Sequence, residues 1–346
     1  MKPLNLLRAS SAISRAPLPA ICLLGRRRSA ASCCFKLAAF PARYFVGLIW
    51  LGMLAWPVIA SENAPHRPFA LWADVPDQGQ FVLGAVYQQA DASAFWAAGQ
   101  RHSVPDDSVS GVHLNQGYFA IQYGISERWA ADLNLGYTKQ TYQGSPAQAE
   151  TSTSGIMDWS FGLRYQLCNE AWAQSAWLPT ATFRAGFVLP GSFDQYSPFS
   201  PGLRSAAIAP ELLLRKHFAW EGFGSYGDGL YRWNRTSGND QYIIALGFFQ
   251  QLKHWEIDLG WRHLQTLSGS DITVAADGTI SYPRSPRENS ESIEAGVSYT
   301  TATRHYRYAG QVRSVLDGNN ADEKFWFGFS VDFPVGGKAT ASPAAP

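Results

Sequence analysis

Ionisable side chains recur at every second position in short alternating runs of this sequence. In Trp129–Tyr137, Asp132 and Asn134 share one face with small residues, and aromatic and aliphatic residues share the other. The same alternation gathers further charges on one face of their runs: Asp158, Arg164, Arg184, Glu211, Glu256, Asp258, Arg262, Glu294, Arg307, Arg313 and Asp332. Such charges could line a passage and sort solutes by charge. They could equally pair with one another as a structural network, which their mixed signs favour.

Alternation with a period of two predicts β-strands, because successive side chains of a strand point to opposite faces. Twelve strands are predicted: Gln80–Gln88, Gly117–Ile125, Trp129–Tyr142, Ile156–Cys168, Leu178–Leu189, Arg204–Leu214, Ala219–Trp233, Gln241–Leu252, Trp255–Gln265, Ser292–Thr300, His305–Val315 and Lys324–Phe333. One face of each is rich in aromatic residues and the other carries Gly and charge. This pattern predicts an all-β fold, a single transmembrane antiparallel β-barrel with lipid outside and a polar interior.

The connections between these strands support a barrel over a soluble β-sandwich. Most even-numbered strands are followed by a tight turn, such as Ser126–Arg128 or Lys253–His254, and most odd-numbered strands by a longer polar loop. Short periplasmic turns and longer outer loops are the rule in outer-membrane barrels. The longest predicted loops are Gln89–Asn115 and Thr266–Ser290, which could fold into the interior or bind a ligand outside.

The first 60 residues predict an export presequence. They contain eight Lys or Arg and no acidic residue, and the apolar stretch Tyr44–Ala60 ends in small residues, as a cleavable signal does. Retention as a membrane anchor is the alternative, and the long basic region before Arg43 also fits an organellar transit peptide or a start codon placed too early. Residues 61–79 are then a periplasmic segment, 80–333 the barrel and 334–346 a disordered tail.

The charge and cysteine content exclude several functional classes. Without residues 1–60 the chain keeps 20 Lys and Arg against 27 Asp and Glu, a net charge of −7, which argues against a nucleic-acid partner. Three of the four cysteines lie in the presequence, so Cys168 alone can form neither an internal disulfide nor a Cys-rich metal site. No cofactor is predicted.

The last predicted strand has a regular pattern in which Phe325, Phe327, Phe329 and Phe333 share one face. A closing strand of this kind resembles the C-terminal signal that the outer-membrane insertion machinery recognises. We therefore expect the strand Phe325–Phe333 to engage that machinery, and the aromatic residues at strand ends to contact outer-membrane lipid.

Three segments resemble one family. GYFAIQYGISERWAADLNLGY is a strand, a tight turn and a strand; GIMDWSFGLRYQL carries Asp158, Gly162 and Arg164 on one face; LPTATFRAGFVLPGSFD leaves its strand through a Pro-Gly loop. Together they are similar to the outer-membrane proteins grouped as "MetA-pathway of phenol degradation". Met157 and Pro190–Gly191 depart from that family's pattern. The resemblance implies a transporter linked to the catabolism of aromatic compounds.

An enzymatic function is not expected. Twelve-stranded outer-membrane phospholipases use a His and a Ser close together on a lipid-facing strand; His263 is the nearest candidate here, and Gln265 stands where the Ser would be. No His and carboxylate cluster has the spacing of a metal site. The sequence thus predicts an outer-membrane channel for passive uptake of small solutes, with hydrophobic or aromatic ones suited to its interior. The alternatives are a closed structural or receptor barrel and, third, a lipid hydrolase.

Overall fold

The computed structural model describes residues 73–103, 109–144, 151–172, 177–193, 202–218, 221–235, 238–275, 280–281, 283, 286–303 and 305–336. The predicted presequence, residues 1–60, lies outside this part of the chain, as do residues 61–72 and 337–346. Within it, no helix is long and apolar enough to cross a membrane.

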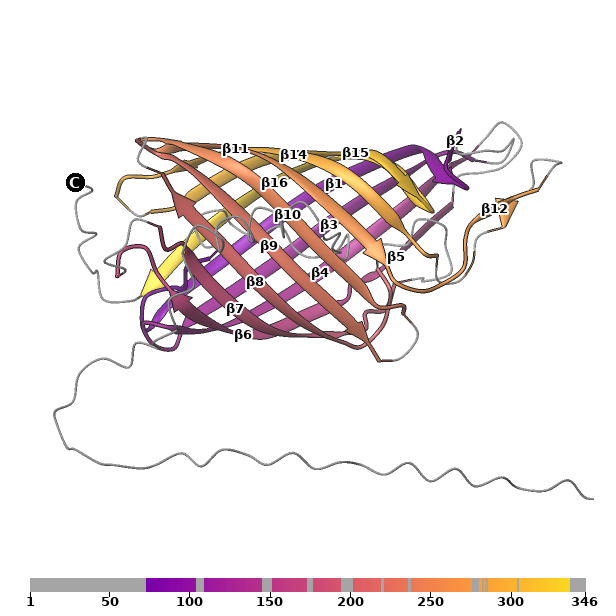
Figure 1. Cartoon of the computed structure of the whole chain (residues 1–346). Coiled ribbons are helices and arrows are strands. Elements are labelled where there is room, and N and C mark those ends of the chain that lie inside the picture. The colour runs from indigo at the N-terminus through magenta and orange to yellow at the C-terminus, as the bar shows by residue number, and fades with distance from the viewer. Residues whose placement is uncertain are drawn as a thin grey trace, which may run out of the picture. The chain divides into compact units, whose positions relative to one another are not determined.

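Twelve antiparallel strands form a closed barrel in which each strand pairs with its neighbours in sequence (Figure 1). They are β1 Gln80–Ala97, β3 Val109–Gly124, β4 Trp129–Gly144, β6 Trp159–Cys168, β7 Thr180–Leu189, β8 Ala207–His217, β9 Phe223–Asn234, β10 Gln241–Leu252, β11 Trp255–Thr266, β14 Asn289–Thr300, β15 Arg307–Asn319 and β16 Ala321–Gly336. The last strand pairs with the first, and β9 lies beside β10, so no strand edge stays open. The predicted number and order of strands are confirmed.

The predicted alternation of faces is visible in the burial of side chains. In β4, Asp132 and Thr138 are buried, while Leu135 and Tyr137 are exposed on the other face. Exposed Phe and Leu would be costly in water and are suited to lipid. We name the two ends of the barrel by their connections: the short-turn end, where β1 begins, and the long-loop end, where β1 finishes.

The prediction of a loop over Gln89–Asn115 is wrong for most of these residues, which form strands instead. The alternation continues past Gln89 in the small buried residues Ala90, Ala92 and Ala94, and β1 reaches Ala97. There the short strand β2, Gln100–Ser103, folds back and pairs with it. The second long loop holds the two short strands β12, Thr273–Val274, and β13, Ile280–Ser281.

The predicted strand Ile156–Cys168 is interrupted. A short strand β5, Thr151–Ile156, and β6 both pair with β4, and Met157 and Asp158 between them belong to neither strand. The amide of Met157 still donates to Gly136 O at 2.8 Å, and its side chain is fully buried beside Val86 and Tyr118. The barrel wall therefore carries an irregularity at this point, which frees Asp158 from the strand pattern.

Residues 73–79 enter the short-turn end of the barrel. The carbonyl of the fully buried Ala73 accepts hydrogen bonds from Gln166 Nε2 at 3.2 Å and from the Thr182 hydroxyl. Ala73 also packs with Leu213 and Phe249, which face the interior from β8 and β10. The segment then crosses to β3, where Gly79 N donates to Gly124 O at 2.8 Å. A segment predicted only to precede the barrel thus occupies part of its interior.

Inward glycines give neighbouring side chains room to lie across the barrel wall. A Cβ at Gly247 would lie 2.5 Å from Cε1 of Tyr226, whose ring from β9 covers Gly247 on β10. In the same way, the side chain of Tyr118 lies over Gly136, and that of Gln311 lies over Gly328. The interior glycines therefore relieve crowding between strands, and neighbouring side chains fill the space they leave.

This packing predicts the effect of adding one methyl group. Gly247→Ala should lower the free energy of unfolding by about 1–3 kcal/mol, because the Tyr226 ring must move from a well-packed site. Gly310→Ala is the matched control, since nothing lies within 4 Å of a Cβ there. Urea unfolding of the two refolded variants measures both values, and equal stability of both would contradict the packing.

Candidate functional site

The guanidinium of Arg184 on β7 is one of the buried charged groups of the barrel interior. Its Nε donates to Asp132 Oδ2 at 2.8 Å and its Nη2 to Oδ1 at 2.5 Å, and Glu211 Oε2 on β8 lies 3.6 Å from Nη1. All three side chains are almost completely buried. A Cβ at Gly162, between Asp132 and Arg184 in the sheet, would lie 2.8 Å from Nε of Arg184. The glycine thus lets the guanidinium reach across a strand to its partner.

Two polar neighbours extend this group. The buried Arg164 on β6 donates from Nη1 to Gln122 Oε1 on β3 at 2.8 Å. Asn134 on β4 donates to Ser160 Oγ at 3.2 Å and lies 3.5 Å from Asp132 Oδ1. This half of the interior therefore pairs its charges with polar side chains of the adjacent strand or of the strand beyond it.

A second group of charges lies on β11, β14, β15 and β16. Arg307 reaches Glu256 at 3.4 Å and Asp332 at 3.7 Å, and its Nε donates to Ser298 Oγ at 3.2 Å. Glu294 Oε1 lies between two guanidinium groups, those of Arg262 at 3.6 Å and Arg313 at 3.7 Å. The mixed signs predicted from the sequence thus lie within ion-pair distance of one another.

Asp258 differs from the other predicted charges. Among the described residues it has no hydrogen bond or ion pair, and its carboxylate lies over Gly296 on the neighbouring strand. Glu256 and Glu294, the nearest acidic residues along β11 and on β14, face the same interior. Replacing Asp258 would therefore remove an inward negative charge without breaking an ion pair among the described residues.

Asp158 is not on a strand face as predicted, because it follows the break after β5. Its Oδ1 accepts from Gly191 N at 3.0 Å, and its Oδ2 from Arg232 Nη2 on β9 at 2.9 Å. Arg232 is fully buried and also donates to Asn234 Oδ1 at 3.1 Å. Sequence reasoning missed Arg232, although its position fits the alternation of β9, because the glycines of that run made the strand irregular.

The sequence also left out an aromatic site near the long-loop end. The indole of Trp326 on β16 is buried between two cations: Arg313 Cζ lies 4.9 Å and Lys324 Nζ 5.9 Å from its ring centroid. The Lys324 ammonium pairs with Asp322 at 2.5 Å. Cations over an indole face stabilise such an arrangement by about 0.5–2 kcal/mol.

His263, the candidate for a phospholipase-like site, is buried. Its Nδ1 contacts the Glu291 carboxylate on β14, and its ring stacks on Trp261 at 5.8 Å between centroids. In the part of the chain described here, no serine hydroxyl bonds to this imidazole, and no group of three or more His, Cys, Asp or Glu is placed to hold a metal ion.

A separate charged cluster lies at the short-turn end. Glu170, in the turn after β6, accepts from Lys216 Nζ at 3.0 Å and from His217 N at 2.8 Å. Burial opposes its ionisation, but the hydrogen bonds from His217 and Lys216 outweigh it and lower the pKa of Glu170 to about 2. Next to it, Arg215 Nη2 donates to Asp74 Oδ1 at 3.2 Å, which ties the entering segment to β8.

Comparison with known proteins identifies the fold. No family model and no curated protein matches the sequence. Among solved structures, the COG4313 outer membrane channel from Pseudomonas putida F1 superposes with a TM-score of 0.58 at 15% identity, over 78% of this chain and 100% of that chain. This chain has the fold of an outer-membrane β-barrel.

Two further barrels match less closely. The translocator domain of the autotransporter NalP from Neisseria meningitidis has a TM-score of 0.41 at 12% identity, over 87% of this chain and 99% of that chain. The CymD monoaromatic hydrocarbon channel has a TM-score of 0.39 at 9% identity, over 75% of this chain and 89% of that one. The resemblance to the phenol-degradation family stays a prediction.

The buried and exposed ion pairs of this barrel should differ in energy. Arg184→Ala leaves Asp132 and Glu211 buried without their cation and should cost about 3–5 kcal/mol of stability. Arg101→Ala removes a pair in which Arg101 is exposed and Glu323 is half-buried, and should cost about 0–1 kcal/mol. Urea unfolding in detergent compares the two; equal losses would refute the buried network.

The Glu170 cluster predicts a specific acid sensitivity. Because the folded-state pKa is depressed, the ionised carboxylate stabilises the fold above its ordinary value of 4.5, and this contribution disappears as pH falls toward about 2. The stability difference between wild type and Glu170→Gln should therefore shrink between these two pH values. A difference that stays constant over that range in urea titrations would show that Glu170 is not held ionised.

Proposed function

We propose that the chain resides in a bacterial outer membrane and forms a channel for passive diffusion of small solutes. The observation that carries this proposal is the closed barrel with an apolar, aromatic outer face and a polar, charged interior, which is the construction of outer-membrane channels. In this membrane the short-turn end faces the periplasm and the long-loop end faces outward.

The predicted pore-lining residues support a channel without strong charge selection. Most are paired, so a charged solute would meet alternating signs. Among the described interior side chains, the seven cations are Arg164, Arg184, Arg232, Arg262, Arg307, Arg313 and Lys324, and the nine acids are Asp132, Asp158, Glu211, Asp228, Glu256, Asp258, Glu294, Asp322 and Asp332. The difference of −2 favours cations weakly.

Apolar groups between these charges favour hydrophobic or aromatic solutes as the substrate class. Val86 packs with Tyr118 and Met157, Trp326 packs with Ala90 and Leu114, and each group lies on the inward face. A small weakly polar solute would lose less hydration at these sites than an ion would.

A closed structural or receptor barrel is the second candidate. The segment that begins at Ala73 occupies the short-turn end, and the paired charges and glycine-seated side chains fill much of the interior. These features would limit flow, and the conductance experiment decides between the two functions.

Single-channel recording of the refolded chain Ser61–Pro346 in a planar bilayer tests the channel. We expect discrete conductance steps with weak cation preference. We expect Asp258→Asn to reduce that preference, because it removes an inward carboxylate that forms no ion pair with any described residue. Arg235→Gln, which changes a charge beside Trp233 at the end of β9, is the control and should keep wild-type selectivity.

A folded chain that passes neither ions nor small aromatic solutes into liposomes would reject the channel and favour the closed barrel. Uptake of aromatic solutes without ion steps would keep the channel and restrict its substrates to apolar ones. Steps with unchanged selectivity in Asp258→Asn would remove that residue from the pore lining.

A further inference from the structure

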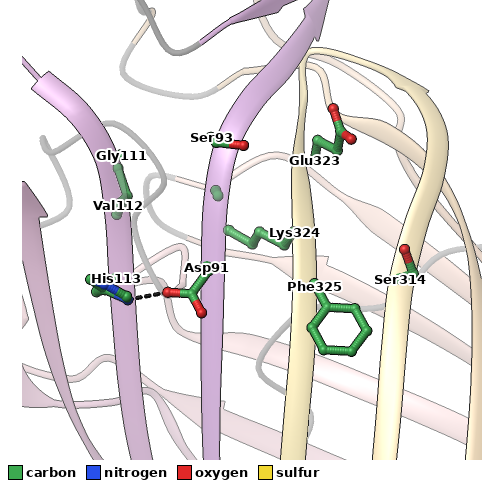
Figure 2. Close-up of a pocket in the computed structure, with 10 residues that line it drawn as sticks. Asp91, Ser93, Gly111, Val112, His113, Ser314, Glu323, Lys324 and Phe325 are labelled. Atoms are coloured by element: carbon green, nitrogen blue, oxygen red, sulfur yellow. Dashed lines mark ion pairs between the residues drawn. The ribbon is translucent and has the colours of Figure 1, made fainter.

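The outer wall of the barrel contains a pocket of about 400 Å³ near the long-loop end (Figure 2). It lies across β1, β3, β15 and β16, and its lining includes Asp91, Ser93, His113, Ser314, Glu323 and Phe325. A volume of this size is at the lower end of the range for small-ligand sites. Of the residues that line the pocket, Lys324 also belongs to the interior charges through its pair with Asp322.

Two interruptions of the sheet create this pocket. The pairing of β1 with β16 shifts between Ala92 and Phe95. The pairing of β15 with β16 stops at Ser314 and Phe325, although β15 continues along β14 as far as Asn319. The wall between these strands therefore has a recess that a regular barrel would lack.

The pocket lies where the apolar outer surface ends. Toward the short-turn end, Phe325, Phe327 and Phe329 are all about half exposed on one face of β16. On the adjacent β1, the exposed Tyr87 is followed on the same face by Gln89, Asp91 and Ser93. This change from apolar to polar residues marks the level at which lipid chains give way to headgroups.

The side chains around the pocket are suited to a ring that carries many hydroxyl groups. Asp91 on β1 pairs with His113 on β3, as Figure 2 shows. Glu323, which pairs with Arg101, supplies a second carboxylate. Ser93 and Ser314 can donate and accept hydrogen bonds. The exposed Phe325 ring forms the apolar edge of the pocket on the side of the phenylalanine row.

We propose that this pocket binds the sugar headgroup of an outer-leaflet glycolipid, whose acyl chains lie along Phe325, Phe327 and Phe329. An amphiphile of this kind matches both surfaces at once, since its hydroxyl-rich ring meets the carboxylates and serines while its chains meet the apolar row. The assignment rests on the proposed outer-membrane location, but it is independent of whether the barrel conducts.

Native mass spectrometry of the full chain in detergent tests the proposal with two probes, rough-type lipopolysaccharide and phosphatidylethanolamine. Wild type should retain the glycolipid selectively. Ser314→Trp, which fills the pocket without removing a charge, should weaken this retention about tenfold, a loss of about 1.4 kcal/mol. Leu316→Trp is the matched control, since Leu316 is exposed two residues along β15 outside the pocket, and it should retain the glycolipid as wild type does.

Equal retention of both lipids by wild type, or equal glycolipid retention by Ser314→Trp and Leu316→Trp, would overturn the proposal. Displacement of the glycolipid by its delipidated core oligosaccharide at equal concentration would also overturn it, because the acyl chains would then contribute nothing. Cell fractionation separates this outcome from failure of the proposed function: a chain found outside the outer membrane rejects both, whereas an outer-membrane chain without selective binding rejects the glycolipid site alone.

Discussion

Closure of the sheet is the constraint on which the rest of this structure depends. Once β16 pairs with β1, every second side chain must enter a shared interior, and every other one must face outward. A barrel of twelve strands has a modest interior, so inward charges from different strands come within reach of one another. Arg184 illustrates the result, because it meets a carboxylate from β4 and another from β8. Pairing is thus the consequence of closure for a chain that carries both signs on its inward faces.

Glycine and large side chains divide the interior between them. A long inward side chain needs a neighbouring position without a Cβ, as Tyr226 needs Gly247 and Arg184 needs Gly162. This reciprocity explains why glycines recur on the same faces as charges. It also limits free volume, because the space above each such glycine is already occupied. These pairs and the segment that enters beside Ala73 together reduce the free space in the interior.

The sequence predicted the features that depend on local pattern. Strand number, order and facing follow from alternation, and β10 has the predicted bounds Gln241–Leu252. The missed features depend on tertiary contacts. β1 extends to Ala97 because small alanines continue its buried face, and β16 ends at Gly336 rather than Phe333 because β1 begins opposite it at Gln80. The pairing of Asp158 with Arg232 requires the break between β5 and β6, and an alternation of apolar and polar residues does not predict such a break. The entry of Ala73 into the barrel depends on Gln166 and Thr182, which lie far along the chain.

The two ends of the barrel use different means to hold the chain in place, and this bears on transport. At the short-turn end, Arg215 ties Asp74 to β8, and Lys216 and His217 next to it bind Glu170, so three consecutive residues of one strand hold two carboxylates. At the long-loop end, Asn320 in the turn between β15 and β16 binds Asp271 and the backbone of Ile272, and Ile272 packs on Phe95. The first attachment is ionic and lies beside the segment inside the barrel, whereas the second is amide-mediated and apolar. A solute that crosses the proposed channel must therefore pass the ionic end last on its way inward. There an apolar solute would leave the Arg215–Asp74 pair intact, whereas an ion would compete for one of its two charged groups.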